Sequence, residues 1–78
     1  MDELQRFCKE RDAALLSLDE KKIRAFAGKH AIKMPENETV FWAGVHKAVI
    51  CLNAATDEQK RDSVFWLIAH GFEPYLEG

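Results

Sequence analysis

The sequence has little of what marks exported, membrane-spanning or metal-binding proteins. Its two cysteines form no Cys-x-x-Cys pair, so their spacing predicts neither a disulfide framework nor a zinc site. The start, Met1-Asp2-Glu3, lacks the basic and apolar regions of a signal peptide. No apolar run approaches the roughly 20 residues that cross a bilayer. We therefore expect a cytoplasmic protein without a membrane segment, in which Cys8 and Cys51 are reduced core residues; a disulfide between them is the alternative.

Sequence motifs of catalysis are also missing. There is no glycine-rich phosphate loop, and the only serines, Ser17 and Ser63, have no base at a recognisable spacing. No two of the histidines and cysteines have the spacing of metal ligands on one helix. We interpret the chain as non-enzymatic, and we expect no cofactor.

Size and charge limit the remaining possibilities. A chain of 78 residues that is 47% hydrophobic and 31% charged predicts a single globular domain. The net charge of -2 argues against a protein that holds nucleic acid by bulk electrostatics. One segment nevertheless has five basic residues and no acid: Lys21, Lys22, Arg24, Lys29 and Lys33. Solvated lysines on an exposed helix explain this segment most simply, but nucleic-acid binding stays open as an alternative function.

Apolar residues recur at helical spacing along the whole chain. The pattern predicts an all-α fold, a small bundle of about four helices over residues 2–16, 18–30, 36–53 and 57–70. The third helix is apolar on most of its circumference, which is typical of a central helix packed by neighbours on several sides. In the first helix, one apolar stripe contains Leu4, Phe7, Cys8, Leu15 and Leu18.

Capping motifs support two of the helix starts and one helix end. Ser17 to Glu20 and Thr56 to Gln59 have the form of capping boxes, which predicts that the second and fourth helices begin there. At the end of the fourth helix, Gly71 is expected in a left-handed conformation, with Phe72 closing the cap.

A nine-residue pattern occurs twice. Glu38-Thr39-Val40-Phe41-Trp42, followed by three residues and His46, corresponds to Asp62-Ser63-Val64-Phe65-Trp66, three residues and His70. The flanking residues do not match, so we infer local similarity and no duplication. In both copies, and again from Phe26 to His30, a histidine follows an aromatic residue by four positions. This spacing predicts three pairs of stacked rings.

The tryptophans are the candidate anchors of a binding surface. On a helical wheel Val64, Phe65, Leu67, Ile68 and Phe72 share one side, and Trp66 points away from them. Either Trp66 is exposed beside His70 as an interface anchor, or another segment covers it. Trp42, beside His46 on the apolar third helix, is more simply explained as covered. The predicted partner-binding residues are Trp66, His70, Trp42 and His46.

Four blocks of sequence resemble a group of small proteins of bacterial phages and prophages. The blocks are Leu15 to Ile23, Met34 to Glu38, Phe41-Trp42-Ala43-Gly44-Val45-His46-Lys47-Ala48, and His70 to Tyr75. The resemblance covers nearly the whole chain and transfers no functional residue. It implies an accessory factor in a bacterial host cell that binds a host or phage protein, including inhibitors of host defence. The sequence thus predicts an interaction protein that binds a protein partner or self-associates.

Overall fold

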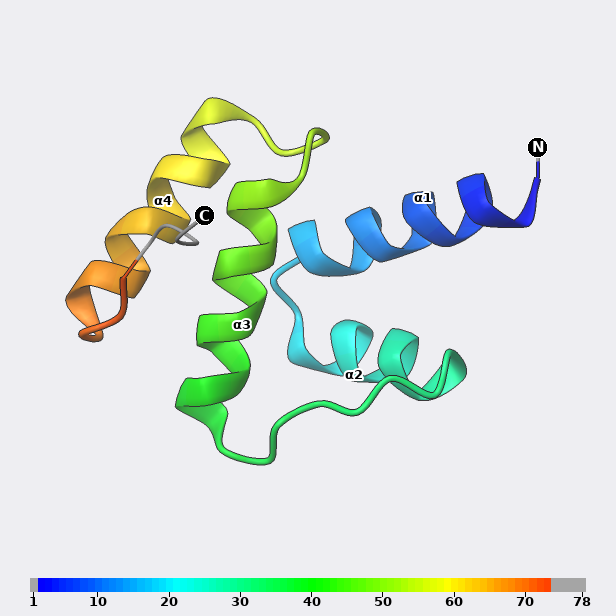
Figure 1. The fold of residues 1–78 in the computed structure, drawn as a ribbon, viewed down its shortest axis with the longest axis horizontal. Helices are drawn as coiled ribbons and strands as arrows, with labels where there is room; N and C mark the ends of the chain where they lie inside the picture. The colour runs from blue at the N-terminus through cyan, green and yellow to red at the C-terminus, as the bar shows by residue number, and fades with distance from the viewer. Residues whose placement is uncertain (1, 74–78) are drawn as a thin grey trace. The chain divides into compact units, whose positions relative to one another are not determined.

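The computed structural model describes residues 2–73, which form four helices and no strand (Figure 1). They are α1 (Glu3–Leu16), α2 (Glu20–Lys29), α3 (Glu38–Cys51) and α4 (Asp57–Ala69). The predicted all-α fold class is confirmed, and every predicted boundary lies within two residues of the observed one. None of the described helices combines the length and the apolar character that crossing a membrane requires.

The chain divides into two compact units, one up to Met34 and one from Pro35 onward. Each unit contains a pair of consecutive helices: α1 contacts α2, and α3 contacts α4. Within each pair the helices run in opposite directions (Figure 1). The short connections favour this arrangement, because a turn of a few residues returns the chain beside the helix it has just left. That the chain acts as a single domain stays a prediction.

The turn between α1 and α2 differs from the predicted capping box. Ser17 is the C-cap of α1, and its Oγ donates to the carbonyl oxygen of Ala14 at 2.6 Å. Leu18 then adopts a positive φ of 51°, and Asp19 becomes the N-cap of α2. The prediction that Ser17 caps α2 was wrong because its own amide still donates to the carbonyl of Ala13, which keeps it in the last turn of α1.

The core of the first unit lies near the turn. Its buried apolar residues are Ala14, Ile23 and Ala27. The predicted stripe on α1 was wrong at both ends, since Leu4 is 70% exposed and Leu18 is also exposed. The helix α2 is four residues shorter than α1, so at about 1.5 Å of rise per residue it leaves the first turn of α1 uncovered.

The helix α3 has the most buried residues of the four, and it contacts α4. Asn37 caps its start by accepting from the amide of Val40 at 3.1 Å. The buried residues are Phe41, Ala43, Val45, His46 and Val49. At about 100° per residue they cover more than half of the circumference. The predicted capping box at the start of α4 is confirmed, with Thr56 and Gln59 bonded to each other's backbone amides.

The second helix of each unit ends in the same way. After α4, Gly71 has a φ of 82° and the amide of Phe72 donates to the carbonyl of Leu67 at 2.8 Å, which confirms the predicted cap. After α2, Ala31 has a φ of 55° and the amide of Ile32 donates to the carbonyl of Ala27, also at 2.8 Å. The two ends differ in the residue at the left-handed position, where alanine is strained and glycine is not.

We expect opposite effects from exchanging these two residues. Ala31→Gly should raise the free energy of unfolding by about 0.5 kcal/mol, because relief of the strained φ exceeds the added chain entropy. Gly71→Ala should lower it by about 1 kcal/mol. A Cβ at Gly71 would meet no atom within 4 Å, so its cost is that of the backbone alone. Urea denaturation followed by circular dichroism measures both, and a loss of stability in Ala31→Gly would contradict the argument.

Candidate functional site

The second unit contains a stack of aromatic rings between α3 and α4. The indole of Trp66 lies between two imidazoles: its ring centroid is 4.6 Å from that of His46 and 3.9 Å from that of His70, with interplanar angles of 27° and 17°. Trp42 lies 6.0 Å from His46, and Phe72 lies 6.3 Å from Trp66. The structure therefore brings the four predicted partner-binding residues into one stack. Their role in binding stays a prediction.

In all three predicted pairs the aromatic ring and the histidine are neighbours, but only Trp66 and His70 are stacked. The rings of Phe26 and His30, with centroids 4.7 Å apart, and those of Trp42 and His46 are tilted against each other. The sequence did not predict that the two copies of the repeat would meet. His46 comes from the first copy and Trp66 from the second, and their contact depends on the antiparallel pairing of α3 with α4 (Figure 1).

A buried hydrogen bond joins the two helices beside the stack. His46 is 7% exposed and Ser63 is 2% exposed, and His46 Nδ1 lies 2.8 Å from Ser63 Oγ. Burial lowers the pKa of His46 below its usual value, and the charge of nearby His70 lowers it further. Neutral imidazole suits this position, since a charged ring would lose its hydration. The pair fixes the rotation of α4 against α3.

The hydrogen bond of His70 determines which of its ring nitrogens carries a proton. His70 caps α4 and is exposed, and its Nδ1 lies 2.8 Å from the carbonyl oxygen of Trp66. Because a carbonyl only accepts, Nδ1 must be the donor.

Equivalent residues of the repeat occupy opposite environments. Phe41 is fully buried whereas Phe65 is 61% exposed, and Thr39 is exposed whereas Ser63 is buried. The predicted core side of α4 was therefore wrong at Phe65 and Ile68, although Leu67 of the same side is buried. α4 packs on α3 with Ser63 and Leu67 buried and Trp66 half-buried. The stabilisation from the contacts of Trp66 and Ser63 with His46 therefore exceeds that from burying the apolar side chains on the other side of α4.

This rotation of α4 leaves an apolar surface uncovered. Phe65 and Ile68 are 61% and 57% exposed, and at a separation of three residues they are neighbours on the helix. We call this pair the α4 surface. The periodicity of the sequence placed these residues in the core. The sequence of α4 alone contains no signal for this rotation, because His46, the partner of Ser63, lies on α3.

In the first unit, ion pairs and aromatic rings line an open groove between α1 and α2. Its volume is about 400 Å³, and it is lined by Glu3, Arg6, Phe7, Glu10, Lys29 and His30. Glu10 pairs with Lys29 at 2.7 Å and with His30 at 3.3 Å. The hydrogen bond from Lys29, followed by that from His30, lowers the pKa of the Glu10 carboxyl. The rings of Phe7 and His30, which both line the groove, meet edge to face with their centroids 4.8 Å apart.

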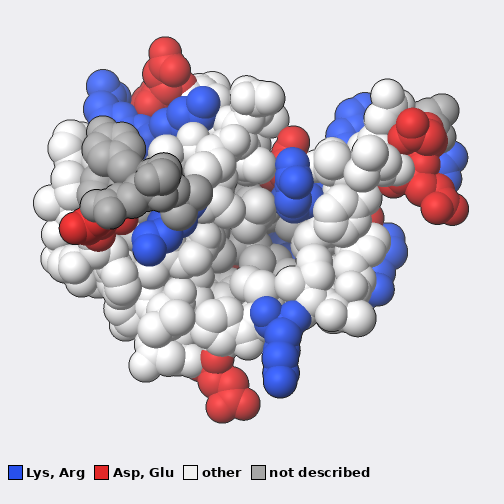
Figure 2. Space-filling view, in the orientation of Figure 1, with Lys and Arg blue, Asp and Glu red and all other residues white. Residues whose placement is uncertain are grey.

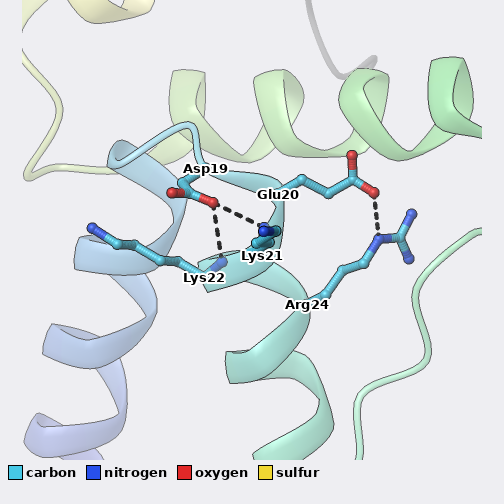
Figure 3. A network of polar contacts seen from close by, with 5 residues as sticks. All are labelled: Asp19, Glu20, Lys21, Lys22 and Arg24. Carbon is cyan, nitrogen blue, oxygen red and sulfur yellow. Dashed lines mark hydrogen bonds and ion pairs between the residues drawn. The ribbon is translucent and has the colours of Figure 1, made fainter.

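The predicted nucleic-acid-binding segment contains engaged and solvated cations. Arg24 pairs with Glu20 at 2.8 Å (Figure 3), and Lys29 pairs with Glu10. Asp19 accepts from the backbone amides of Lys21 and Lys22, while the side chain of Lys22 extends away from this carboxylate (Figure 3). Residues 21–33 contain no acid, but Glu20 and Glu10, which lie outside this segment, pair with two of its basic residues. These ion pairs reduce the local positive charge of the segment.

Comparison of the chain with protein-family models, with curated proteins and with solved structures gives no match. Within residues 2–73, no group of three or more histidine, cysteine, aspartate or glutamate side chains could hold a metal ion. Cys8 and Cys51 are both free. The prediction that both belong to the core was wrong for Cys51, which is exposed near the C-terminal end of α3.

The two aromatic residues at the centre of the second copy should differ in their effect on stability. Trp66→Ala removes a ring packed between two imidazoles and should lower the free energy of unfolding by roughly 2 to 3 kcal/mol, somewhat less than for a fully buried tryptophan. Phe65→Ala, at an exposed position of the same helix, should change it by less than about 0.5 kcal/mol. Denaturation by urea, read by circular dichroism, distinguishes them; equal losses would place Phe65 in the core.

Removing the buried hydroxyl should also destabilise the second unit. Ser63→Ala leaves Nδ1 of His46 without its partner and should cost about 1 to 3 kcal/mol. Thr39→Ala, at the equivalent exposed position of the first copy, is the matched control and should cost much less. The same denaturation experiment applies, and equal effects of the two substitutions would show that the bond between His46 and Ser63 contributes nothing.

Proposed function

We propose that this chain is a non-enzymatic interaction protein that binds a protein partner through the α4 surface. The observation that carries the proposal is the exposure of Phe65 and Ile68 on an ordered helix. Adjacent large apolar side chains on an ordered surface mark interaction sites, because binding removes them from water. Phenylalanine is among the residues enriched at the centre of protein interfaces.

The surroundings of the α4 surface support this proposal. Arg61 and Asp62 are exposed one turn before it, which fits the polar rim that surrounds the apolar centre of an interface. Over much of the second unit, the surface seen in Figure 2 is neither acidic nor basic. Such a surface favours a protein partner over a polyanion, which would require clustered cations.

The ring stack gives the α4 surface a fixed position. Trp66 and His70 pack on one side of α4, and Phe65 points to another, so the contacts of the stack determine which residues the helix presents. A surface that is ordered before binding loses less conformational entropy when the partner arrives. In this proposal, Trp66, His70, Trp42 and His46 position the helix, and the accessible edges of Trp66 and His70 extend its contact area.

The partner is a host or phage protein if the resemblance to small phage and prophage proteins holds. The context of a phage or prophage accessory factor in a bacterial cell, including inhibition of host defence, stays a prediction on that ground. A second copy of the chain is the other protein that the same surface would accept. Nucleic-acid binding has less support, because two of the five basic residues are paired with acids.

The experiment is a capture of binding proteins from bacterial lysate by the tagged chain, with and without nuclease, read by mass spectrometry. The double variant Phe65→Ser/Ile68→Ser removes the α4 surface. Leu4→Ser, a substitution of the same kind at an exposed apolar residue of the first unit, is the matched control. We expect nuclease-resistant partners with the wild type and with Leu4→Ser, and a loss of more than tenfold in recovery with the double variant, since a truncated interface anchor costs about 2 kcal/mol or more.

Circular dichroism must first show that the double variant is folded, and sedimentation then tests self-association. A dimer of the wild type that becomes monomeric in the double variant would identify the partner as a second copy. Equal recovery of partners by the double variant would contradict the assignment of the α4 surface. Recovery that disappears with nuclease would favour the nucleic-acid alternative through Lys21, Lys22 and Lys33.

A further inference from the structure

We propose that the stack of His46, Trp66 and His70 is a pH-sensitive latch, which holds α4 on α3 at neutral pH and releases it when the buried imidazole of His46 is protonated. The inference concerns the packing of the second unit and does not rest on the identity of any partner. It begins from an arrangement of rings: a single indole lies between two titratable groups.

The two imidazoles differ in their surroundings. His70 is exposed at the C-terminal end of α4, and its Nδ1–H donates to the carbonyl of Trp66. His46 is buried, and its hydrogen-bond partner is the neutral hydroxyl of Ser63. His46 is therefore the imidazole whose protonation opposes the packing of α4 on α3.

The charges around His46 offer it no compensation. On α4, His70 faces it across the ring of Trp66 and disfavours a second positive charge. On α3, Lys47 is the next residue and places its Nζ 6.0 Å from the ring of Phe72. The remaining charged groups of α4 are Asp57, Glu58, Lys60, Arg61 and Asp62. Among the described residues, no carboxylate is bonded to either imidazole of the stack.

Two causes lower the pKa of His46: burial, which is the larger, and the charge of His70. Both favour the neutral ring in the folded state. The free-energy cost of protonating His46 falls when α4 separates from α3, because water then reaches the imidazole.

The direction of the pH dependence follows from linkage. In the unfolded hairpin His46 titrates near its ordinary value of 6.5, whereas its pKa in the folded state is lower. Above about pH 6.5 the full stability is present, and it is lost as the pH falls through the pKa of the folded state, because the unfolded state binds the proton more tightly. Uptake of one proton changes the folding equilibrium constant by at most about tenfold per pH unit.

The first unit provides an internal contrast. His30 faces Glu10 at 3.3 Å, so this imidazole, unlike that of His46, has an acidic partner. The lowered pKa of Glu10 means that this carboxylate keeps its charge to a more acidic pH than usual. The contribution of the Glu10 carboxylate to the stability of the first unit is lost only as the pH falls through that lowered pKa. Mild acid should thus release the second unit and leave the pairing of His30 with Glu10 in place.

The test follows urea unfolding by tryptophan fluorescence at about pH 7.5 and at about pH 5, which brackets the ordinary titration of histidine. Both tryptophans, Trp42 and Trp66, belong to the second unit, so the signal reports on that unit. We expect a lower midpoint at the acidic pH for the wild type, and a much smaller decrease for His46→Phe, which keeps an aromatic ring and removes the titration. His30→Gln is the matched control and should retain the wild-type decrease.

Two further measurements keep the outcome decisive if His46→Phe does not fold. His70→Gln removes the charge that faces His46 and should reduce the decrease in midpoint. In the wild type, nuclear magnetic resonance of the imidazole Cε1 proton of His46 should show a pKa below 6.5. The proposal is overturned if the wild-type midpoint does not fall at acidic pH, if His46→Phe loses as much as the wild type, or if His46 titrates at 6.5 or above.

Discussion

The packing of one indole between two imidazoles is the interaction on which the second unit depends. Trp66 contacts His46 on one side and His70 on the other, and the buried bond between His46 and Ser63 fixes the same rotation of α4. Aromatic contacts of this kind are directional, and a buried polar pair must be satisfied in full. Together they select one orientation of the helix out of several that apolar burial alone would accept.

The exposed α4 surface is a consequence of that selection. A helix has a limited circumference, so placing Ser63, Leu67 and Trp66 toward α3 turns Phe65 and Ile68 away from it. Hydrophobic burial is not directional and would have favoured the opposite rotation. The loss of burial at Phe65 and Ile68 is offset by the satisfied hydrogen bond and the ring stack. A surface suited to binding thus arises from the same contacts that hold the hairpin together.

Much of the fold could be predicted from the sequence, because helix starts and ends depend on neighbouring residues. Thr56 with Gln59, and Gly71 with Phe72, act within a few positions, and both caps are confirmed. The prediction that Ser17 caps α2 was wrong because Asp19, two residues later, is the residue that caps this helix. The site was less predictable. That His46 would meet Trp66 depends on how α3 and α4 pair, and the wheel of a single helix contains no information on which side its neighbour will cover.

The pairing of adjacent helices also determines how the chain reaches its structure. In both units the contacting helices are consecutive in sequence and joined by a short connection, so the pairing of helices within each unit closes only a small loop. Loop closure over few residues costs little entropy, and folds dominated by local contacts form quickly. During synthesis from the N-terminus, the contacts between α1 and α2 involve no residue beyond the first unit. In this order of synthesis, α1 and α2 can pair before α3 and α4 have been made.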